Sequence, residues 1–350
     1  MGAWLEREWQ RLGGLALIFL PLAALYALAV LVRRFAYRTR LLPAWRARVP
    51  VIVVGNITAG GTGKTPLTLA ILEALERHGF SPGVVSRGYG RVPRGVNDPL
   101  GVVRVYPDVA TPEHFGDEPV LIARRSRVPV YVSPDRPAAA RALLESHPEV
   151  DVLVSDDGLQ HYALARDIEI AVVDGERRFG NGLLLPAGPL REPVSRLASV
   201  DAVVVAGEAA GTVPGSPQFT MRLGHDRFVG LGGRQEASVE EFALAARGRK
   251  VVAIAGIAYP ERFFEHLADL GIAARTVAFP DPHAFQPAEL RLPGAELVVM
   301  TEKDAVKCAA YADSRMWFLR VDAIVARGLE ELLVARLQTL ARSPDGPQAA

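Results

Sequence analysis

Short apolar runs recur between residues 51 and 206, and glycine, proline or charged residues separate them. Runs of this length, rich in valine and isoleucine, are typical of strands that are buried on both faces. Helical patterns, such as the one over residues 138–145, lie between several of them. This alternation predicts an α/β fold with a mostly parallel sheet covered by helices. The predicted strands are residues 51–54, 83–86, 128–132, 152–155, 168–173 and 202–206.

The pattern then changes and predicts a second, smaller α/β domain. Two short strand-like runs, 219–223 and 228–231, flank the sequence Gly224-His225-Asp226 and predict a hairpin that serves as a linker. The elements expected after it are strand 251–255, helix 260–270, strands 273–279, 296–300 and 317–321, and a closing helix 327–341. We therefore expect an N-terminal helix in residues 1–40, a first domain in 41–215, a hairpin linker in 216–247, a C-terminal α/β domain in 248–342 and a disordered tail in 343–350.

The N-terminal region contains a long apolar segment. Residues 13–32 carry no charge, and this length is close to what is needed to cross a bilayer core. Three arrangements are open: a helix that spans the membrane, a helix that lies in its interface, and a buried core helix kinked at Pro21. Length and flanking charge favour membrane contact, and the arginines that follow place the C-terminal side in the cytoplasm. These arginines are Arg33, Arg34, Arg38 and Arg40.

Composition narrows the class of protein. Apolar residues make up 49% of the 350 residues and charged residues 23%, which is typical of a globular protein with substantial cores. The net charge of +1 argues against a nucleic-acid-binding protein, which would normally be strongly basic. The single cysteine, Cys308, excludes an internal disulfide and is expected to be a small buried residue. We expect the chain to act as a monomer.

The sequence GNITAGGTGKTP, residues 55–66, connects the first predicted strand to an apolar stripe at helical spacing that ends near Gly79. A glycine-rich turn between a strand and a helix N-terminus is typical of a phosphate-binding loop, because its backbone N–H groups can surround an anion. The alternative is a chance glycine-rich turn, which the flanking strand and helix disfavour. Lys64 is expected to reach the β- and γ-phosphates of a nucleoside triphosphate, and Thr65 to bind Mg²⁺. Thr58 stands where the usual pattern opens with glycine. The candidate nucleotide-binding residues are Thr58, Ala59, Gly60, Gly61, Thr62, Gly63, Lys64 and Thr65.

An acidic pair follows another predicted strand. In DVLVSDDGLQH, Asp156 and Asp157 come directly after the apolar run, at the edge of the sheet where ligands of α/β proteins bind. Acidic residues in this position hold Mg²⁺ in phosphate-loop proteins. A helix cap or an Asx-turn is the alternative. The phosphate loop favours the metal site.

Two further motifs are ambiguous by themselves. HFGDEP contains Asp117 and Glu118 in a predicted loop, where an acidic pair before proline is usually a solvated turn. Phosphoryl transfer, however, needs a carboxylate near the acceptor hydroxyl. RGYGR, residues 87–91, combines Arg87, Tyr89 and Arg91, which either bind an anionic substrate or form a turn.

Taken together, the motifs resemble the tetraacyldisaccharide 4′-kinases of the lipid A pathway. The resemblance rests on VGNITAGGTGKTP, SRGYGR, GDEP, SDDGLQH, DGERRFGNG, LPAGPLRE and TEKDAVK, in this order, and extends from about residue 13 to 335. It implies transfer of the ATP γ-phosphate, with Mg²⁺, to the 4′-hydroxyl of a tetraacylated glucosamine disaccharide 1-phosphate. It also implies action at the cytoplasmic face of the inner membrane.

The resemblance also implies roles for individual residues. Asp117 corresponds to the proposed general base, and Lys64 and Thr65 to the phosphate-loop lysine and the Mg²⁺ ligand. Asp156 and Asp157 correspond to the acidic pair on the metal side. Glu192, in LPAGPLRE, is implied as a further contributor to the metal site.

One motif departs from the family. The family usually has Asp-His in its C-terminal region, and this histidine pairs with the catalytic aspartate. In this chain Asp281 is followed by Pro282, and the histidine is displaced to His283. Either His283 reaches Asp117, in a site between the two domains, or Asp117 acts alone.

Two other classes share the phosphate loop. A membrane-attached ATPase that regulates partners by hydrolysis is one, and a non-catalytic nucleotide-binding protein is the other. Neither explains the whole ordered series of motifs.

Overall fold

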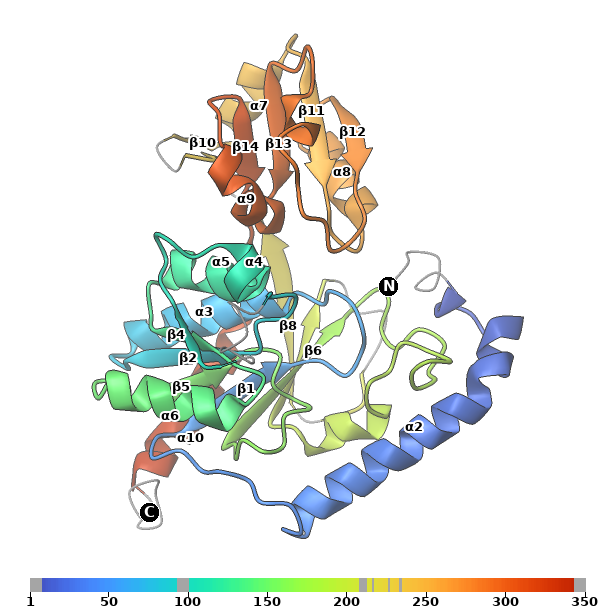
Figure 1. The fold of residues 1–350 in the computed structure, drawn as a ribbon, viewed down its shortest axis with the longest axis vertical. Helices are drawn as coiled ribbons and strands as arrows, with labels where there is room; N and C mark the ends of the chain where they lie inside the picture. Colours follow the sequence, from blue (N-terminus) through green and yellow to red (C-terminus); the bar gives the residue numbers. More distant parts are fainter. Residues whose placement is uncertain are drawn as a thin grey trace. The chain divides into compact units, whose positions relative to one another are not determined.

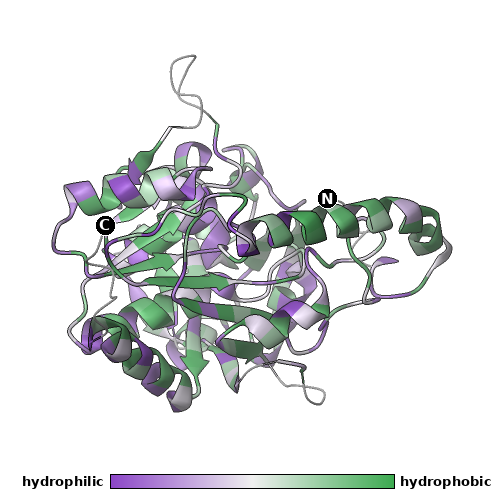
Figure 2. Ribbon diagram, turned by 90° about the horizontal axis from the view of Figure 1, so that it is seen from below, coloured by the Kyte–Doolittle hydropathy of each residue, from purple (hydrophilic) through white to green (hydrophobic). Residues whose placement is uncertain are grey.

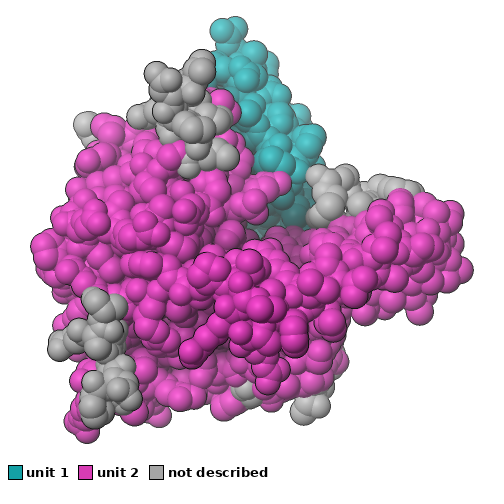
Figure 3. All heavy atoms as spheres, turned by 60° about the horizontal axis from the view of Figure 1, so that its bottom comes forward, with its two compact units in different colours: residues 1–3, 224–322 teal, residues 4–223, 323–350 magenta. Residues whose placement is uncertain are grey.

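The computed structural model describes residues 8–92, 101–207, 213–215, 217–225, 227–232 and 235–342. The chain forms two compact units, which Figure 3 shows in different colours. Unit 1 contains Gly224–Asp322, and unit 2 contains the described residues up to Leu223 together with those from Ala323 onward. The expected tail, residues 343–350, lies outside the described residues.

Unit 2 is built on a nine-stranded sheet in the order β15-β8-β7-β6-β1-β5-β2-β4-β3. Parallel pairing runs from β8 to β4, and β3 pairs antiparallel with β4. β1 lies between β6 and β5, where Ile52 is level with Ile168 and Val154. The strands are β1 (Val51–Gly55), β2 (Pro82–Ser86), β3 (Val103–Val105), β4 (Val130–Val132), β5 (Val152–Ser155), β6 (Ile168–Asp174), β7 (Ala202–Ala206), β8 (Gln218–Gly224) and β15 (Asp322–Val325).

Helices cover this sheet (Figure 1). They are α3 (Lys64–Arg77), α4 (Pro112–Phe115), α5 (Asp117–Ser126), α6 (Arg136–Ser146), the 3₁₀ helix η1 (Val194–Ser199) and α10 (Arg327–Arg342), whereas α2 (Gly14–Arg38) runs along the side of the unit and is largely exposed. The core between them is aliphatic, with Val53, Leu143 and Leu153 fully buried. The predicted α/β fold with a mostly parallel sheet is therefore confirmed. Its strands are apolar along almost their whole length because helices bury both faces of the sheet.

Unit 1 has a six-stranded mixed sheet in the order β10-β9-β14-β13-β11-β12. Its strands are β9 (Arg227–Gly230), β10 (Glu236–Ser238), β11 (Val251–Ala255), β12 (Ala274–Ala278), β13 (Leu297–Thr301) and β14 (Met316–Leu319). Its helices are α7 (Val239–Ala246), α8 (Pro260–Asp269), η2 (Glu289–Arg291), α9 (Glu302–Cys308) and η3 (Ala309–Tyr311). Cys308 is buried, as predicted, and burial raises the pKa of its thiol to about 12.

The predicted hairpin around residue 224 is wrong. β8 pairs with β7 in unit 2, whereas β9 pairs with β10 and β14 in unit 1. The two strands pack in different cores. Met221 of β8 is fully buried in unit 2, and Phe228 of β9 stacks on Phe242 in unit 1, with the ring centroids 3.9 Å apart. Two adjacent strand-like runs indicate strands but not their neighbours, and here the chain leaves one sheet for the other between them.

The closing helix also lies elsewhere than expected. The C-terminal domain predicted at residues 248–342 is wrong at its end, because the chain from Ala323 onward, with most of β15 and all of α10, belongs to unit 2. There Arg77 of α3 forms two hydrogen bonds with Glu330 of α10, at 2.9 and 3.0 Å. Unit 1 is therefore inserted before the last strand and helix of unit 2.

Helix α2 is the one described helix that is long and apolar enough to cross a membrane. Ala16 and Ala23 are its only buried residues, so the buried-core arrangement is wrong. Its remaining surface is largely apolar and exposed, as the hydropathy colouring of Figure 2 shows. Pro21 lies within the helix without ending it.

Candidate active site

The phosphate loop lies between β1 and α3, as predicted. Two of its glycines have backbone angles that favour glycine, with φ +94° at Gly60 and +83° at Gly63. A Cβ on Gly63 would also lie 2.9 Å from the Cε of Met221. These glycines let the chain turn directly into α3, whose first residue is Lys64.

A buried asparagine that the sequence analysis did not single out holds this loop from within. The Asn56 amide donates to Thr62 Oγ1 at 3.1 Å and to Thr58 Oγ1 and the Gly60 carbonyl at 3.4 Å. Thr58, which replaces the usual glycine, is therefore part of the loop's internal hydrogen bonding. The place of Asn56 directly after a buried strand was the available signal.

Lys64 and the two aspartates meet at the same edge of the sheet. The Lys64 ammonium lies 3.5 Å from Asp157 Oδ1, and Asp157 is also 3.2 Å from the Arg191 guanidinium. Although burial would raise the pKa of Asp157, the charges of Lys64, Arg191 and Arg136 hold it well below its usual range. Asp157 is therefore a fixed negative charge beside the phosphate loop.

Asp156, the neighbouring residue, has the opposite electrostatics. It is 1% exposed and accepts hydrogen bonds from Thr68 Oγ1 at 3.3 Å and from Ser86 Oγ at 3.4 Å. Burial, followed by the charges of Glu118 and Asp157, raises its pKa to about 7. A bound cation would oppose this shift and favour the ionised form.

A fully buried arginine lies beneath the pair. Arg136 donates to Ser155 Oγ at 2.6 Å and to the backbone carbonyls of Val85 and Asp157 at 3.3 Å. Burial lowers its pKa to about 10, so it keeps its charge at neutral pH. Nearby His161 has its pKa lowered to about 3, by burial and then by Arg136, and so stays neutral. The cations at this edge suit a polyphosphate.

The residues present fit Mg²⁺ only in part. No group of three or more His, Cys, Asp or Glu side chains in the described part of the chain is arranged to hold a metal ion. Mg²⁺ in phosphotransferases, however, is usually held by one or two protein ligands, water and the substrate's phosphates. Thr65, at the start of α3, and Asp156, at the end of β5, fit that smaller set.

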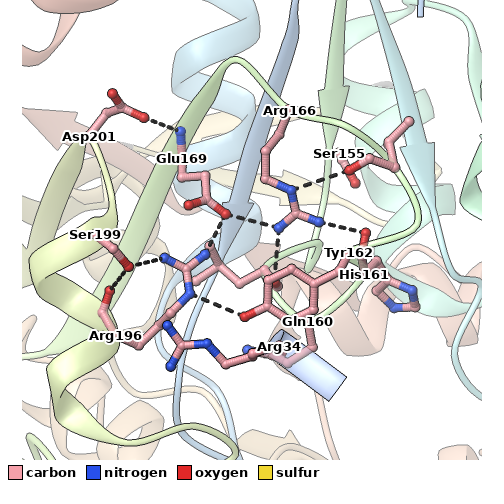
Figure 4. A network of polar contacts seen from close by, with 12 residues as sticks. Arg34, Ser155, Gln160, His161, Tyr162, Arg166, Glu169, Arg196, Ser199 and Asp201 are labelled. Atoms are coloured by element: carbon pink, nitrogen blue, oxygen red, sulfur yellow. Dashed lines mark hydrogen bonds and ion pairs between the residues drawn. The ribbon is translucent and has the colours of Figure 1, made fainter. Parts of the chain in front are cut away.

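Glu192 fits the expected metal role poorly. It is 1% exposed, and its carboxylate accepts hydrogen bonds from Tyr162 and, at 3.0 Å, from Gln160. Arg34 and Arg196 lie 3.9 and 3.8 Å from it. It belongs to a polar network, of which Figure 4 shows a part: Arg166 and Arg196 bond to Glu169, with Gln160 and Tyr162 nearby.

Close contacts between glycines join the RGYGR and GDEP segments. A Cβ on Gly116 would lie 2.9 Å from the Tyr89 carbonyl and 3.3 Å from Gly88 Cα. Asp117 is the first residue of α5 rather than part of a loop, since proline is tolerated in the first turn of a helix. The candidate base thus starts a helix beside the RGYGR segment. Tyr89 is 76% exposed there.

The three RGYGR residues do not have equal environments. Arg87 is exposed, like Tyr89, whereas Arg91 is half-buried and donates to the Gly101 carbonyl at 2.8 Å. Arg87 and Tyr89 are therefore open to a ligand, and Arg91 supports the segment.

His283 lies in unit 1, and Asp117 lies in unit 2. Within unit 1 the imidazole bonds to Glu289 Oε2 at 3.0 Å and lies against the rings of Phe279 and Phe285, at 4.5 and 4.8 Å. His283 therefore has a carboxylate partner in its own unit. The pairing with Asp117 stays a prediction.

Comparison with known proteins decides the family. The family model described as tetraacyldisaccharide-1-P 4′-kinase matches residues 15–338. This chain belongs to that family. The tetraacyldisaccharide 4′-kinase of Dechloromonas aromatica is 48% identical over 344 residues, which is 97% of this chain and 98% of the relative. The enzyme of the same name from Methylobacillus flagellatus is 44% identical, over 96% of each chain.

A solved structure is similar throughout. It is LpxK from Aquifex aeolicus in complex with ATP, with a TM-score of 0.76 and 28% sequence identity over 92% of this chain and 99% of that one. The family indicated by the ordered motifs is thus confirmed, and so is the fold.

Proposed function

We propose that this chain transfers the γ-phosphate of ATP to the 4′-hydroxyl of a tetraacyldisaccharide 1-phosphate. The observation that carries the proposal is the meeting of the phosphate loop, Lys64 and the Asp156–Asp157 pair at one sheet edge, in a member of this kinase family. The name of the similar solved structure, which holds ATP, supports the nucleotide. The product would be the bisphosphorylated lipid A precursor.

The chain's own groups can be assigned to the steps of this transfer. Backbone N–H groups of the phosphate loop and the N-terminus of α3 bind the phosphates, and Lys64 moves from Asp157 to neutralise the charge that develops on the transferred group. Mg²⁺, when bound, would offset phosphate charge, held by Thr65 and Asp156. Before the nucleotide binds, Asp157, which is itself paired with Arg191, would keep Lys64 at the loop.

Asp117 would act on the acceptor. A carboxylate within hydrogen-bond reach of the sugar hydroxyl orients it and accepts its proton as the hydroxyl oxygen bonds to the γ-phosphorus. The bond from that phosphorus to the bridging β-phosphate oxygen breaks, and ADP leaves. The exposed Arg87 and Tyr89, on the adjacent segment, would bind the anionic disaccharide. His283, if it reaches Asp117, would polarise it.

Helix α2 would bring this site to the membrane. Its inner side carries Ala16, Ala23 and Tyr26, and the Tyr26 hydroxyl donates to the Arg191 carbonyl at 3.0 Å. Because Tyr26 and Arg34 bond to the rest of unit 2, an α2 that spanned the bilayer would draw those parts of the unit into it. We therefore propose that α2 lies in the interface of the cytoplasmic face of the inner membrane, with its leucines in lipid.

Product analysis tests the function. Purified protein with radiolabelled ATP, Mg²⁺ and the disaccharide acceptor in detergent micelles should form a labelled phospholipid. Lys64→Ala should lower turnover by about 10²-fold or more, because it removes charge stabilisation of the transition state. Release of inorganic phosphate alone, with no labelled lipid, would instead support the regulatory ATPase.

A further inference from the structure

One segment, residues 181–192, connects helix α2 to the phosphate loop; we call it the connecting segment. On its α2 side, the Trp9 indole donates to the Pro186 carbonyl at 3.0 Å, and the Asn181 N–H donates to the Trp9 carbonyl at 2.7 Å. The Tyr26 hydroxyl donates to the Arg191 carbonyl at 3.0 Å. These bonds fix α2 and the residues before it at two separate places.

The same segment bonds to the phosphate loop. The Ala59 N–H donates to the Pro189 carbonyl, and the Arg191 N–H donates to the Ile57 carbonyl, each at 2.7 Å. Arg191 therefore accepts a bond from α2 through its carbonyl and donates one to the loop through its N–H. A single residue, Arg191, thus connects helix α2 to the phosphate loop.

The connecting segment is built to be stiff. The Asn181 amide donates to the Ala187 carbonyl at 2.9 Å, and the Leu190 N–H donates to the Leu183 carbonyl at 3.1 Å. Gly188 is enclosed so tightly that an added Cβ would lie 2.2 Å from Asn181 Oδ1. A displacement at one side of such a segment is passed to the other, since packed structure deforms little.

Glu192 makes a second, charged connection. Its carboxylate lies 3.9 Å from Arg34 of α2 and accepts from Gln160 Nε2 at 3.0 Å. The same Gln160 nitrogen donates to the Asn56 carbonyl at 3.0 Å, and Asn56 supports the phosphate loop. Figure 4 shows Arg34, from α2, beside Gln160 and Tyr162. Tyr162 has its pKa raised to about 12, by burial and then by Glu192, so it stays a donor to that carboxylate.

We propose that α2 is a positioning element of the nucleotide site, which acts through the connecting segment and Glu192 to set the affinity for ATP. Tyr26 and Arg34 are its positioning residues. Glu192 thereby stabilises the phosphate loop through Gln160 and Asn56, and α2 has a role in nucleotide binding as well as in contact with lipid. The expected change in the KM for ATP rests on the proposed kinase function. The expected change in the Kd for ATP does not, because it is measured by binding alone.

The test uses the full chain with Tyr26→Phe and Arg34→Gln combined, in detergent micelles with saturating acceptor lipid. We expect the KM for ATP, and the Kd for Mg²⁺-ATP measured by calorimetry without acceptor, to rise at least about five-fold, the lower end of typical coupling between sites. The value of kcat should change less than KM. Detergent removes differences in membrane binding from the comparison.

Matched variants make the result specific. The control combines Arg46→Gln with Tyr311→Phe, two residues outside α2. Arg46→Gln removes an arginine ion pair with Asp167, and Tyr311→Phe removes the hydroxyl of a partly exposed tyrosine. This control should leave both ATP constants unchanged. Tyr26→Phe alone, which removes one oxygen atom, should still raise the Kd for ATP and guards against a folding defect in the double variant.

Unchanged KM and Kd for ATP in the folded Tyr26→Phe and double variants would overturn the proposal, even if the melting temperature fell. A raised Kd for ATP without formation of any labelled lipid by the parent chain would support the coupling and contradict the kinase function.

Discussion

At the scale of single residues, two adjacent carboxylates have opposite properties. Asp156 faces the hydroxyls of Thr68 and Ser86 in a buried site, and its pKa is raised to about 7 by burial and then by Glu118. Asp157 faces Lys64 and Arg191, and its pKa is lowered by their charges. Although the two residues are adjacent in sequence, the Asp156 carboxyl is costly to ionise and the Asp157 carboxylate is held ionised.

This difference predicts opposite effects on stability. Between the unfolded pKa of about 3.9 and the folded value of about 7, folded Asp156 binds more protons than unfolded Asp156, so its contribution to stability falls as pH rises. Asp156→Asn should therefore raise the melting temperature relative to the parent at pH 8 more than at pH 5, measured by thermal unfolding with EDTA.

Asp157→Asn is the matched variant. Because the pKa of Asp157 is depressed, its stabilising contribution is present above the unfolded pKa and is lost as pH falls below it. This variant should be less stable than the parent at pH 8. Equal shifts of both variants at both pH values would contradict the assignment of the two environments.

Asp117 is expected to act only in the chemical step. Asp117→Ala should lower kcat by about 10²- to 10⁴-fold, the usual contribution of a general base, with little change in the Kd for ATP. If His283 acts with it, the double variant should be no slower than the slower single variant. Steady-state kinetics on the disaccharide measures both; near-normal kcat in Asp117→Ala would leave the base unassigned.

At the scale of elements, glycines hold the acceptor-side segments together. Gly116 has φ +89° and ψ 152°, a region nearly restricted to glycine, and it lies against the RGYGR segment. The start of α5, and with it Asp117, depends on this contact. The way in which the RGYGR segment meets the start of α5 therefore depends on Gly116.

Gly116→Ala should therefore impair both stability and activity. We expect a loss of about 2–4 kcal/mol in unfolding free energy, from backbone strain and the clash with the Tyr89 carbonyl, and a clear fall in kcat. Gly79→Ala is the control, because Gly79 also has positive φ (+81°) but open space at its Cβ. It should lose about 1 kcal/mol and keep its kcat; equal effects in both variants would mean that strain alone acts at Gly116.

At the scale of the whole molecule, one side of α2 is exposed in the described part of unit 2. Leu25, Leu28 and Val32 are 65%, 58% and 55% exposed, and they share the outer side of the helix. The opposite side contacts the rest of unit 2 through small residues and Tyr26. This division suits a helix that lies between a protein surface and a lipid surface.

Replacing Leu25, Leu28 and Val32 by glutamine should move the protein from membranes into the soluble fraction. Each side chain would lose apolar burial of roughly 1.5 kcal/mol or more, while the bonds of Tyr26 and Arg34 to unit 2 remain. Flotation with lipid vesicles measures the partition. Leu244→Gln, at an equally exposed leucine (64%) of α7, should leave it unchanged, and an unaltered triple variant would exclude α2 as the lipid contact.

Much of this protein could be predicted from its sequence, because the deciding interactions are local. The buried strands, the phosphate loop before α3 and the acidic pair after β5 depend on contiguous residues whose period and turn chemistry are visible in one dimension. The ordered motifs were sufficient to indicate the family. Parallel strands then required the ends of β1, β2 and β5 to meet at one edge.

Only the tertiary structure decided the rest, because it depends on partners that are distant in sequence. Spacing does not show that β8 and β9 enter different sheets, that α10 returns to unit 2, or that Asp117 begins a helix. Nor does it distinguish a carboxylate that is open to a metal ion from one that is already bonded. Glu192 belongs to the second kind because Gln160 and Tyr162 reach it through the fold, and their hydrogen bonds exist only once the chain is folded.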